Sequence, residues 1–147
     1  MEIEKVIYIM IGCIGVFMIV ALITSIPKPY DETKLENNTV VRVIDGDTFE
    51  YYDLTTDKVL KVRLLCVNTP EKKEDGYEEA RDYLRSLIMY REVKLVSSVT
   101  DKDKYGRLLR YVYVNELGEN VFVNKRMITE GYGELMIVPP EECAIVK

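Results

Sequence analysis

Histidine does not occur in this sequence of 147 residues. Its absence excludes Ser-His triads, Cys-His pairs, histidine-ligated zinc sites and every site that uses histidine as its base. Acid–base chemistry must then come from carboxylates, Lys, Tyr, Cys or water. Positive charge is also scarce, since 20 Lys and Arg face 25 Asp and Glu and the net charge is −5. Proteins that hold duplex nucleic acid through its phosphates are usually basic, so this balance disfavours tight, non-specific duplex binding.

Cysteine is scarce as well, with only Cys13, Cys66 and Cys143. An odd count at wide spacing does not indicate a disulfide framework or a zinc site. Cys13 lies in an apolar N-terminal run and Cys66 alternates within a strand-like run, so both are interpreted as small buried hydrophobic residues. A bond between Cys66 and Cys143 is the less favoured alternative.

One long stretch, residues 6–26, contains no charged residue. About 20 apolar residues are enough to cross a bilayer as a helix. A cleaved secretory signal is the competing interpretation, but signals have apolar regions of about 7–15 residues after a basic start. This chain begins with Glu2 and Glu4 before Lys5. We therefore expect residues 1–27 to be an uncleaved single-pass membrane anchor; the Lys and Arg distribution leans only slightly toward a cytoplasmic domain.

The remainder is expected to form one domain. Residues 28–38 are polar, begin near Pro27 and Pro29, and are typical of a linker. Residues 39–147 are long enough for a small core. Beyond residue 27 the chain carries 19 basic and 23 acidic side chains, so this part is acidic too.

Periodicity predicts a mainly β domain of the α+β class. A helix over residues 77–90 is indicated by a stripe of apolar side chains at helical spacing, and a second helix by Asn120–Glu130 with Gly131 placed to end it. Closure of five short strands leaves no exposed sheet edges, which favours an OB-type five-stranded barrel with two short helices after the N-terminal transmembrane helix. The expected strands are Thr39–Ile44, Thr48–Leu54, Val59–Val67, Val93–Val99 and Leu108–Val114.

Charged residues interrupt this apolar pattern at two places. Asp45-Gly46-Asp47-Thr48 could be an ordinary hairpin turn, but within a continuous apolar run the glycine favours a bulge that re-aims a side chain. Arg63 stands in the most apolar strand, where an unpaired charge would be costly. It is interpreted either as half of a buried ion pair or as a rigid guanidinium that binds a phosphate through its planar fork.

Two further motifs follow, each unremarkable when taken alone. Asn68-Thr69-Pro70-Glu71 leaves the same strand, and Pro70 stiffens the turn that presents Glu71. Tyr105-Gly106-Arg107 follows Lys104 in a polar loop. Carboxylates with an Asn amide suit a hard cation, and two guanidinium groups suit a phosphate. As an ordered set, the motifs indicate a metal-dependent phosphodiesterase site.

The order I-D-G-D-T, V-R-L-L-x-V-N-T-P-E, D-K-Y-G-R and V-N-K-R-M-I-T-E-G-Y resembles the staphylococcal nuclease (thermonuclease-like) family over about residues 38–138. The resemblance implies an OB-type barrel and calcium-dependent hydrolysis of DNA and RNA phosphodiesters. It implies that Asp47 is a calcium ligand, that Asp45 is an acid close to the ligands, and that Thr69 offers its backbone carbonyl. Asn68 stands where well-known members have a second calcium-binding Asp. Its amide oxygen can still ligate calcium, with one negative charge fewer.

The resemblance also assigns the catalytic roles. Glu71 would orient or deprotonate the attacking water, while Arg63 and Arg107 would bind the phosphate and stabilise its transition-state charge. Lys104 and Tyr105 would contact a terminal phosphate or sugar of the nucleotide. These roles agree with phosphodiester hydrolysis by in-line attack of water.

We expect a membrane-anchored nuclease that prefers single strands or frayed ends, because a small acidic domain supplies little backbone electrostatics. The family's substrate-stacking tyrosines are unmatched, since Leu135–Pro139 stands in their place. The alternatives are a catalytically silent OB module that binds nucleic acid or a protein at the membrane, and a phosphodiesterase for small molecules.

Overall fold

The computed structural model describes residues 38–140 and 143–146. The expected anchor (residues 1–27) and all but the last residue of the expected linker (residues 28–38) lie outside the described residues. Within the part of the chain that the structure describes, no helix is long and apolar enough to cross a membrane. These residues form a mainly β fold with two α-helices, as the sequence predicts.

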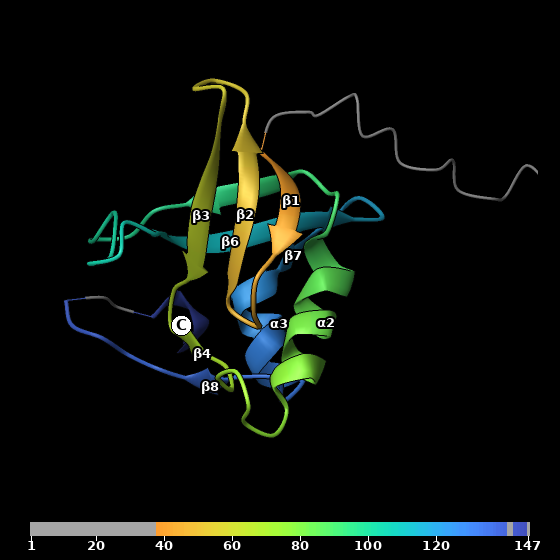
Figure 1. Ribbon diagram of the computed structural model, residues 1–147, viewed down its shortest axis with the longest axis vertical. Coiled ribbons are helices and arrows are strands. Elements are labelled where there is room, and N and C mark those ends of the chain that lie inside the picture. Colours follow the sequence, from red (N-terminus) through yellow and green to blue (C-terminus); the bar gives the residue numbers. More distant parts are fainter. Residues whose placement is uncertain (1–37, 141–142, 147) are drawn as a thin grey trace, which may run out of the picture. The chain divides into compact units, whose positions relative to one another are not determined.

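Three antiparallel strands open the domain: β1 (Thr39–Val43), β2 (Thr48–Asp53) and β3 (Lys58–Leu64). They are the three upright arrows of Figure 1, coloured orange to olive. The turn between β2 and β3 forms where expected, because the Asp53 carboxylate accepts hydrogen bonds from Thr55 N–H (3.0 Å) and Thr56 Oγ1 (2.8 Å). Short polar side chains that bond their own backbone in this way favour turns.

The other strands cross behind this meander. Strand β6 (Leu108–Glu116) pairs in parallel with β3 and antiparallel with β5 (Val93–Val96) and β7 (Glu119–Phe122). The result is a mixed six-stranded sheet in the order β1-β2-β3-β6-β5, with β7 added to β6. In the parallel pairing of β3 with β6, Arg63 lies opposite Leu109. The pairing therefore brings the strand that carries Arg63 close to the segment that carries Arg107, directly before β6.

The ends of this sheet meet without forming a full ladder. Val40 N–H donates to Arg91 O (3.0 Å), Val93 N–H donates to Asn38 O (3.1 Å), and one isolated bridge joins residues 39 and 92. The pairing is consistent with an OB-type fold, and the ladders of the described strands do not show a closed five-stranded barrel. Strand β7 adds a pair outside the predicted set, and the two sheet ends meet through residues 38–40 and 90–93.

Helix α2 (Tyr77–Ile88) confirms the predicted stripe. Ala80, Leu84, Leu87 and Ile88 are buried, and Tyr83 stacks on Tyr132 with ring centroids 4.0 Å apart. The helix packs against β1 and against α3 (Val123–Thr129) at one end of the sheet (Figure 1). Its buried face completes a core whose largest fully buried side chains include Phe49, Leu64 and Met127.

The second helix begins later than the sequence predicts. Residues 119–122 form β7 instead, because Leu117 and Gly118 both have positive φ (52° and 91°) between the paired residues 116 and 119. A two-residue turn with positive φ at both positions matches the twist of a hairpin and extends β6 into β7. The predicted end is correct, since Gly131 follows the helix with a φ of 79°.

The predicted strand Val59–Val67 is broken. Strand β3 ends at Leu64, Cys66 adopts a φ of 62°, and the chain restarts as β4 (Val67–Asn68), which pairs with β8 (Glu134–Leu135). The left-handed conformation at Cys66 belongs to a turn that separates β4 from β3. That turn could not be read from an apolar, alternating sequence, because Gly and Asn, the usual left-handed residues, are absent from it.

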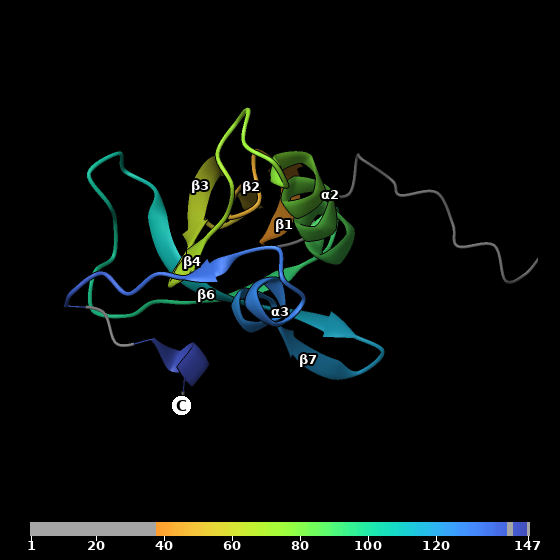
Figure 2. The same ribbon diagram turned by 90° about the horizontal axis from the view of Figure 1, so that it is seen from below.

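Cys66 and Cys143 form a disulfide bond, so the favoured interpretation of Cys66 as a small buried hydrophobic residue was wrong and the less favoured alternative is correct. The bond spans 77 residues of sequence, and closing a loop of this length stabilises a fold by roughly 4 kcal/mol in the chain-entropy account. Figure 2 shows the last part of the chain, the short 3-10 helix η1 (Ala144–Val146), turning back beneath β6. There Cys143 packs with Leu65 and Tyr111 in a second, smaller hydrophobic cluster.

Asn124, at the start of α3, is fully buried and joins three backbone segments. Its amide nitrogen donates to Leu65 O (2.9 Å) and Arg110 O (3.1 Å), and its amide oxygen accepts from Val112 N–H (2.8 Å). The residue therefore fixes the turn after β3 against β6. Sequence analysis assigned it no role, because an Asn inside a predicted helix looks like an ordinary surface residue.

Replacement of Asn124 by Ala should lower the free energy of unfolding by about 3 kcal/mol, because buried backbone groups lose their partners. Asn120→Ala, at an exposed position of β7, is the matched control and should change it by less than about 0.5 kcal/mol. Urea denaturation of the full chain measures both. Equal, small effects would contradict the bridging role of Asn124.

Candidate active site

The segment between β1 and β2 brings Asp45 and Asp47 into the site. It is a tight turn with a backbone bond from Asp45 N–H to Thr48 O (3.3 Å), so the expected bulge within a continuous strand was wrong. A Cβ atom added at Gly46 would lie 2.7 Å from Thr69 Oγ1. Only glycine therefore lets this turn approach the segment after β4.

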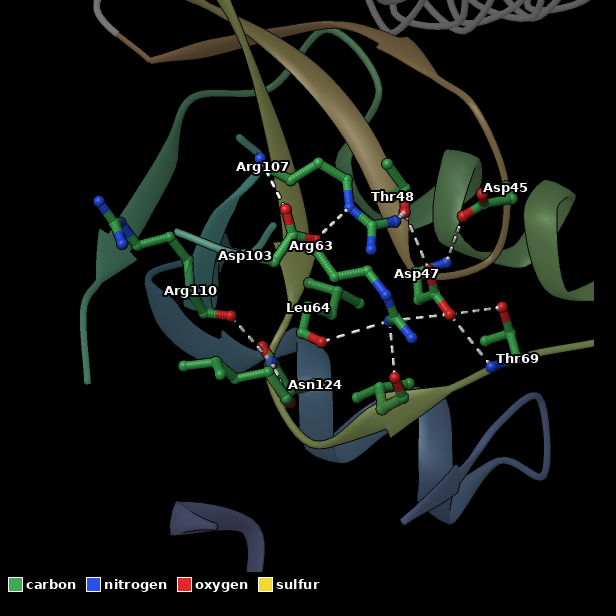
Figure 3. A network of polar contacts seen from close by, with 12 residues as sticks. Asp45, Asp47, Thr48, Arg63, Leu64, Thr69, Asp103, Arg107, Arg110 and Asn124 are labelled. Carbon is green, nitrogen blue, oxygen red and sulfur yellow. Dashed lines mark hydrogen bonds and ion pairs between the residues drawn. The ribbon is translucent and has the colours of Figure 1, made fainter. Parts of the chain in front are cut away.

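Asp47 and Arg63 form a buried ion pair, with Arg63 Nη1 2.8 Å from Asp47 Oδ2. The same Oδ2 accepts bonds from Thr69 N–H (3.1 Å) and Thr69 Oγ1 (3.0 Å), and Oδ1 accepts from Thr48 Oγ1 (2.9 Å). Figure 3 shows these contacts converging on the Asp47 carboxylate. Of the two interpretations of Arg63, the structure thus shows the buried ion pair.

The pair leaves part of the Arg63 guanidinium available. Nη1 also donates to Val67 O (2.6 Å) and, at 3.4 Å, to Leu64 O. Among the described residues, Nε and Nη2 have no hydrogen-bond partner, and no buried side-chain nitrogen there lacks one. Nε and Nη2 are therefore accessible, and Arg63 lines an open pocket. The ion pair and a bound anion can use different atoms of the same group.

Burial raises the pKa of the Asp47 carboxyl from 3.8 to about 6, and nearby Asp45 adds to the effect, while Arg63 opposes it. Burial likewise lowers the pKa of Arg63, with the charge of Arg107 acting in the same direction and that of Asp47 against it. The attraction between the two charges therefore offsets part of the cost of burying each of them. Keeping both side chains charged in this buried site costs desolvation free energy.

Arg107 is held by its own loop. Its Nε donates to Asp103 Oδ2 (2.6 Å), its backbone N–H donates to Asp103 Oδ1 (3.0 Å), and its Nη1 reaches Thr48 Oγ1 at 3.4 Å. The guanidinium carbon also lies 5.4 Å from the centre of the Tyr105 ring. Lys104 and Tyr105 are exposed at the tip of the same loop. The structure therefore brings Arg107 to the Asp47–Arg63 pair through Thr48.

Asn68 and Glu71 lie at the rim of the site. Asn68 is exposed and pairs with Glu134 across the β4–β8 ladder. Glu71 is exposed in a turn closed by Glu74, whose backbone N–H donates to Glu71 O (2.8 Å). The negative charge of Glu71 favours the ionised form of Arg63 and opposes the lowering of its pKa, so the two side chains lie within electrostatic reach.

Two cavities flank the Asp47–Arg63 pair. The first, about 430 Å³, is here called the acidic cavity, and among its lining residues are Asn68, Thr69, Glu74, Asp75, Glu79 and Glu134. The second, about 400 Å³, is here called the arginine pocket, and among its lining residues are Arg63, Leu65, Lys102, Arg107, Met136 and Val138. The site thus presents negative charge on one side and guanidinium groups beside an apolar wall on the other.

Thr48 and Asp103 belong to the sequence motifs, but the sequence indicated no function for either residue. Thr48 links the Asp47 carboxylate to Arg107, and Asp103 aims the Arg107 side chain. The Val67 carbonyl, which orients Arg63, carries no side-chain signal at all. The spacing of four residues between Asp103 and Arg107 is the one signal that could have indicated their pairing.

The oxygen donors near Asp47 suit a hard cation such as Ca²⁺, which prefers carboxylate, carbonyl and amide oxygens. Asp45, Asp47, the Thr69 carbonyl and the Asn68 amide supply such donors, and Asp47 Oδ1 accepts only one of the hydrogen bonds described above. Within residues 38–140 and 143–146, no group of three His, Cys, Asp or Glu is placed to hold a metal. The donor types therefore suit calcium, but the described residues do not show them arranged as a metal site.

Known proteins are similar to this chain in sequence. The chain is similar to an uncharacterized endonuclease of Escherichia coli (38% identity over 92 residues, 63% of this chain and 56% of the relative). It is also similar to endonuclease YncB of Bacillus subtilis (34% over 119 residues, 76% and 54%) and to a thermonuclease of Staphylococcus intermedius (31% over 121 residues, 78% and 68%). The chain thus spans little more than half the length of the first two relatives.

Residues 61–143 match the family described as staphylococcal nuclease homologue. The matched segment begins in β3 and ends at Cys143, so it contains Arg63, Asn68, Glu71 and Arg107. The match covers more than half of the chain, and the thermonuclease is matched over two thirds of its length. The chain therefore belongs to the staphylococcal nuclease family.

Proposed function

We propose that this protein is a metal-dependent nuclease that hydrolyses phosphodiester bonds of DNA or RNA. The observation that carries the proposal is the arginine pocket, where accessible N–H groups of Arg63 lie beside Arg107. Two planar guanidinium groups in one pocket suit the oxygens of a phosphate. Family membership and relatives named endonuclease and thermonuclease support the same activity.

The residues divide the chemistry between them. Arg63 and Arg107 bind the phosphate and stabilise the charge that develops on its oxygens, and the Asp47 pair holds Arg63 in place for this task. Glu71, exposed at the rim, orients or deprotonates the attacking water. A calcium ion held by Asp47, the Thr69 carbonyl and the Asn68 amide would polarise the phosphoryl group and favour the attacking hydroxide.

The pocket favours flexible substrates. Its walls beyond the charged residues are aliphatic, so bases cannot stack there as they do on aromatic side chains, a contact worth about 1–3 kcal/mol per base. Lys104 and Tyr105, exposed at the loop tip, are proposed to contact a neighbouring phosphate or sugar. Single-stranded or frayed DNA and RNA can bend into such a pocket, whereas a rigid duplex needs a wide basic surface that an acidic protein lacks.

Residues 6–26 are proposed to anchor this domain to a membrane. The disulfide between Cys66 and Cys143 favours the extracytoplasmic side, because structural disulfides persist in oxidising compartments and are rare in the cytosol. The distribution of Lys and Arg, by contrast, slightly favours a cytoplasmic domain. The disulfide carries more weight, since the positive-charge difference rests on a few residues.

The purified full chain with Ca²⁺ should cleave single-stranded DNA or RNA, and Arg107→Ala should lower the rate about 100- to 1,000-fold. Arg63→Lys should also lose activity, because a lysine ammonium group cannot bond the Asp47 carboxylate and the substrate phosphate as a planar guanidinium group does. Arg81→Ala removes a surface charge on α2 that pairs with Asp82, so it serves as the control. A folded full chain that leaves both substrates intact contradicts the proposal, and binding without turnover, indifferent to EDTA, supports a silent OB module.

Asn68→Asp should raise calcium affinity at least about tenfold, since a unit charge about 4 Å from a divalent ion contributes roughly 2 kcal/mol even in water. Asn120→Asp adds the same charge at an exposed position of β7, and it should leave the affinity unchanged. Isothermal titration calorimetry without substrate gives both dissociation constants. Equal constants for Asn68→Asp and the parent protein would remove residue 68 from the metal site.

The rate of cleavage should fall as the pH drops through about 6. Protonation of Asp47, whose pKa burial raises to about 6, removes the negative charge that pairs with Arg63. Because one proton is bound, kcat/KM should drop about tenfold per pH unit below that value. A pH profile from about pH 3 to 8 tests this, and a limb near the ordinary Asp value of 3.8 would be the contrary result.

A further inference from the structure

The arginine pocket has two walls from segments far apart in the sequence. One wall is the turn after β3, with Leu65 and Cys66, beside Arg63. The other is the segment after β8, with Met136 and Val138. The width of the pocket therefore depends on what holds residues 136–139 against the turn.

Cys66 fastens this second wall at both of its ends. At one end Met136 N–H donates to Cys66 O (3.1 Å), directly after the two-residue β4–β8 ladder. At the other end Cys143 is joined to the Cys66 sulfur. Cys66 thus holds one end of this wall by a hydrogen bond and is joined covalently to Cys143 beyond its other end, and Ala144 N–H bonds to Tyr111 Oη (3.1 Å) just after Cys143.

Side-chain packing contributes little to the position of this wall. Ile137 and Val138 are 54% and 55% exposed, so their burial cannot hold the wall in place. Cys143 itself is 3% exposed and packs with Leu65 and Tyr111. Among the described residues, the wall is therefore attached by the Met136–Cys66 hydrogen bond and by the Cys66–Cys143 disulfide, and the covalent bond is the stronger of the two.

The same turn also orients the catalytic guanidinium. Arg63 Nη1 donates to Val67 O (2.6 Å), the carbonyl directly after Cys66. Cys66 holds a left-handed φ of 62°, which a non-glycine residue adopts only at a cost in energy. The contacts of Cys66 therefore affect the position of residues 136–139 and the orientation of Arg63. Asp47 and Asn124 also hold the Arg63 side of the turn, independently of Cys66.

We propose that the Cys66–Cys143 disulfide is a positioning element for substrate binding, which keeps residues 136–139 as the apolar wall of the arginine pocket. The proposal rests on the nuclease function inferred above and names a determinant of its affinity. Breaking the bond frees the far end of the wall and widens the pocket while Arg63, Arg107 and Glu71 stay in place. The nucleotide next to the scissile phosphate then loses its preorganised contact surface. Reduction by a dithiol transfers two electrons and two protons to the sulfur pair and oxidises the dithiol to its disulfide.

The test uses the full chain with Cys13→Ser, in which Cys66 and Cys143 are the only cysteines. This chain is compared with the same chain carrying the additional substitution Cys143→Ser. Binding of a fluorescein-labelled, single-stranded octanucleotide is measured by anisotropy in EDTA, where turnover does not interfere. The dissociation constant should rise about tenfold in Cys143→Ser, because a preorganised surface becomes mobile. Ile145→Ala, which trims the packing of the same segment and leaves the disulfide intact, should change it less than about twofold.

Kinetics separate positioning from a general loss of structure. With Ca²⁺, Cys143→Ser should raise KM for the octanucleotide about tenfold with kcat within about twofold. Bis(p-nitrophenyl) phosphate is too small to need the second wall, so its kcat/KM should be unchanged. Unchanged oligonucleotide binding and KM in a folded Cys143→Ser chain overturn the proposal while the nuclease function stands.

Reduction of the Cys13→Ser chain by a dithiol is the second route to the same state. It should reproduce the weaker binding, and reoxidation should restore it, with the circular dichroism spectrum of the fold retained throughout. Complete unfolding on reduction would overturn the proposal, since the bond would then act on global stability alone. Should the chain cleave no substrate, the anisotropy comparison still decides the role of the disulfide, and the nuclease function fails separately.

Discussion

The buried ion pair between Asp47 and Arg63 is the interaction on which the site depends. It joins the β1–β2 turn to the end of β3, and through Thr69 it also ties in the segment after β4. Removing either partner would leave a buried charge without compensation, which is far more costly than the loss of a surface pair. The pair therefore acts as a structural support and as a holder of a functional arginine at once.

Charge is separated across this pair. Carboxylates gather in the acidic cavity on the side of Asn68 and Thr69, while Arg63, Arg107 and Lys102 line the arginine pocket. A phosphodiester with a cation on one of its oxygens has the complementary distribution. A protein with a net charge of −5 can in this way offer a locally positive pocket to an anionic substrate without a basic surface.

Much of the fold and part of the site could be predicted. The β1–β2–β3 meander, the stripe of α2 and the end of α3 before Gly131 follow from periodicity and turn chemistry, which act over a few residues. Asp47 and Arg63 were recognisable because charged residues interrupt apolar runs, whereas Arg107 was recognisable only as part of the ordered set of motifs. Thr48 and Asp103 escaped notice because their importance lies in contacts with Arg107, across 59 residues for Thr48.

The sequence by itself determined which residue types are available: no histidine, one arginine in an apolar run and another in a polar loop, and an Asn where a second acid was expected. Tertiary structure alone decided that β3 stops at Leu64, that Cys66 bonds to Cys143, and that the sheet ends meet in a single bridge. The physical reason is range. Local propensities are set by neighbouring residues, whereas the turn at Cys66 and its disulfide exist only because β6, α3 and the C-terminal segment converge on that turn.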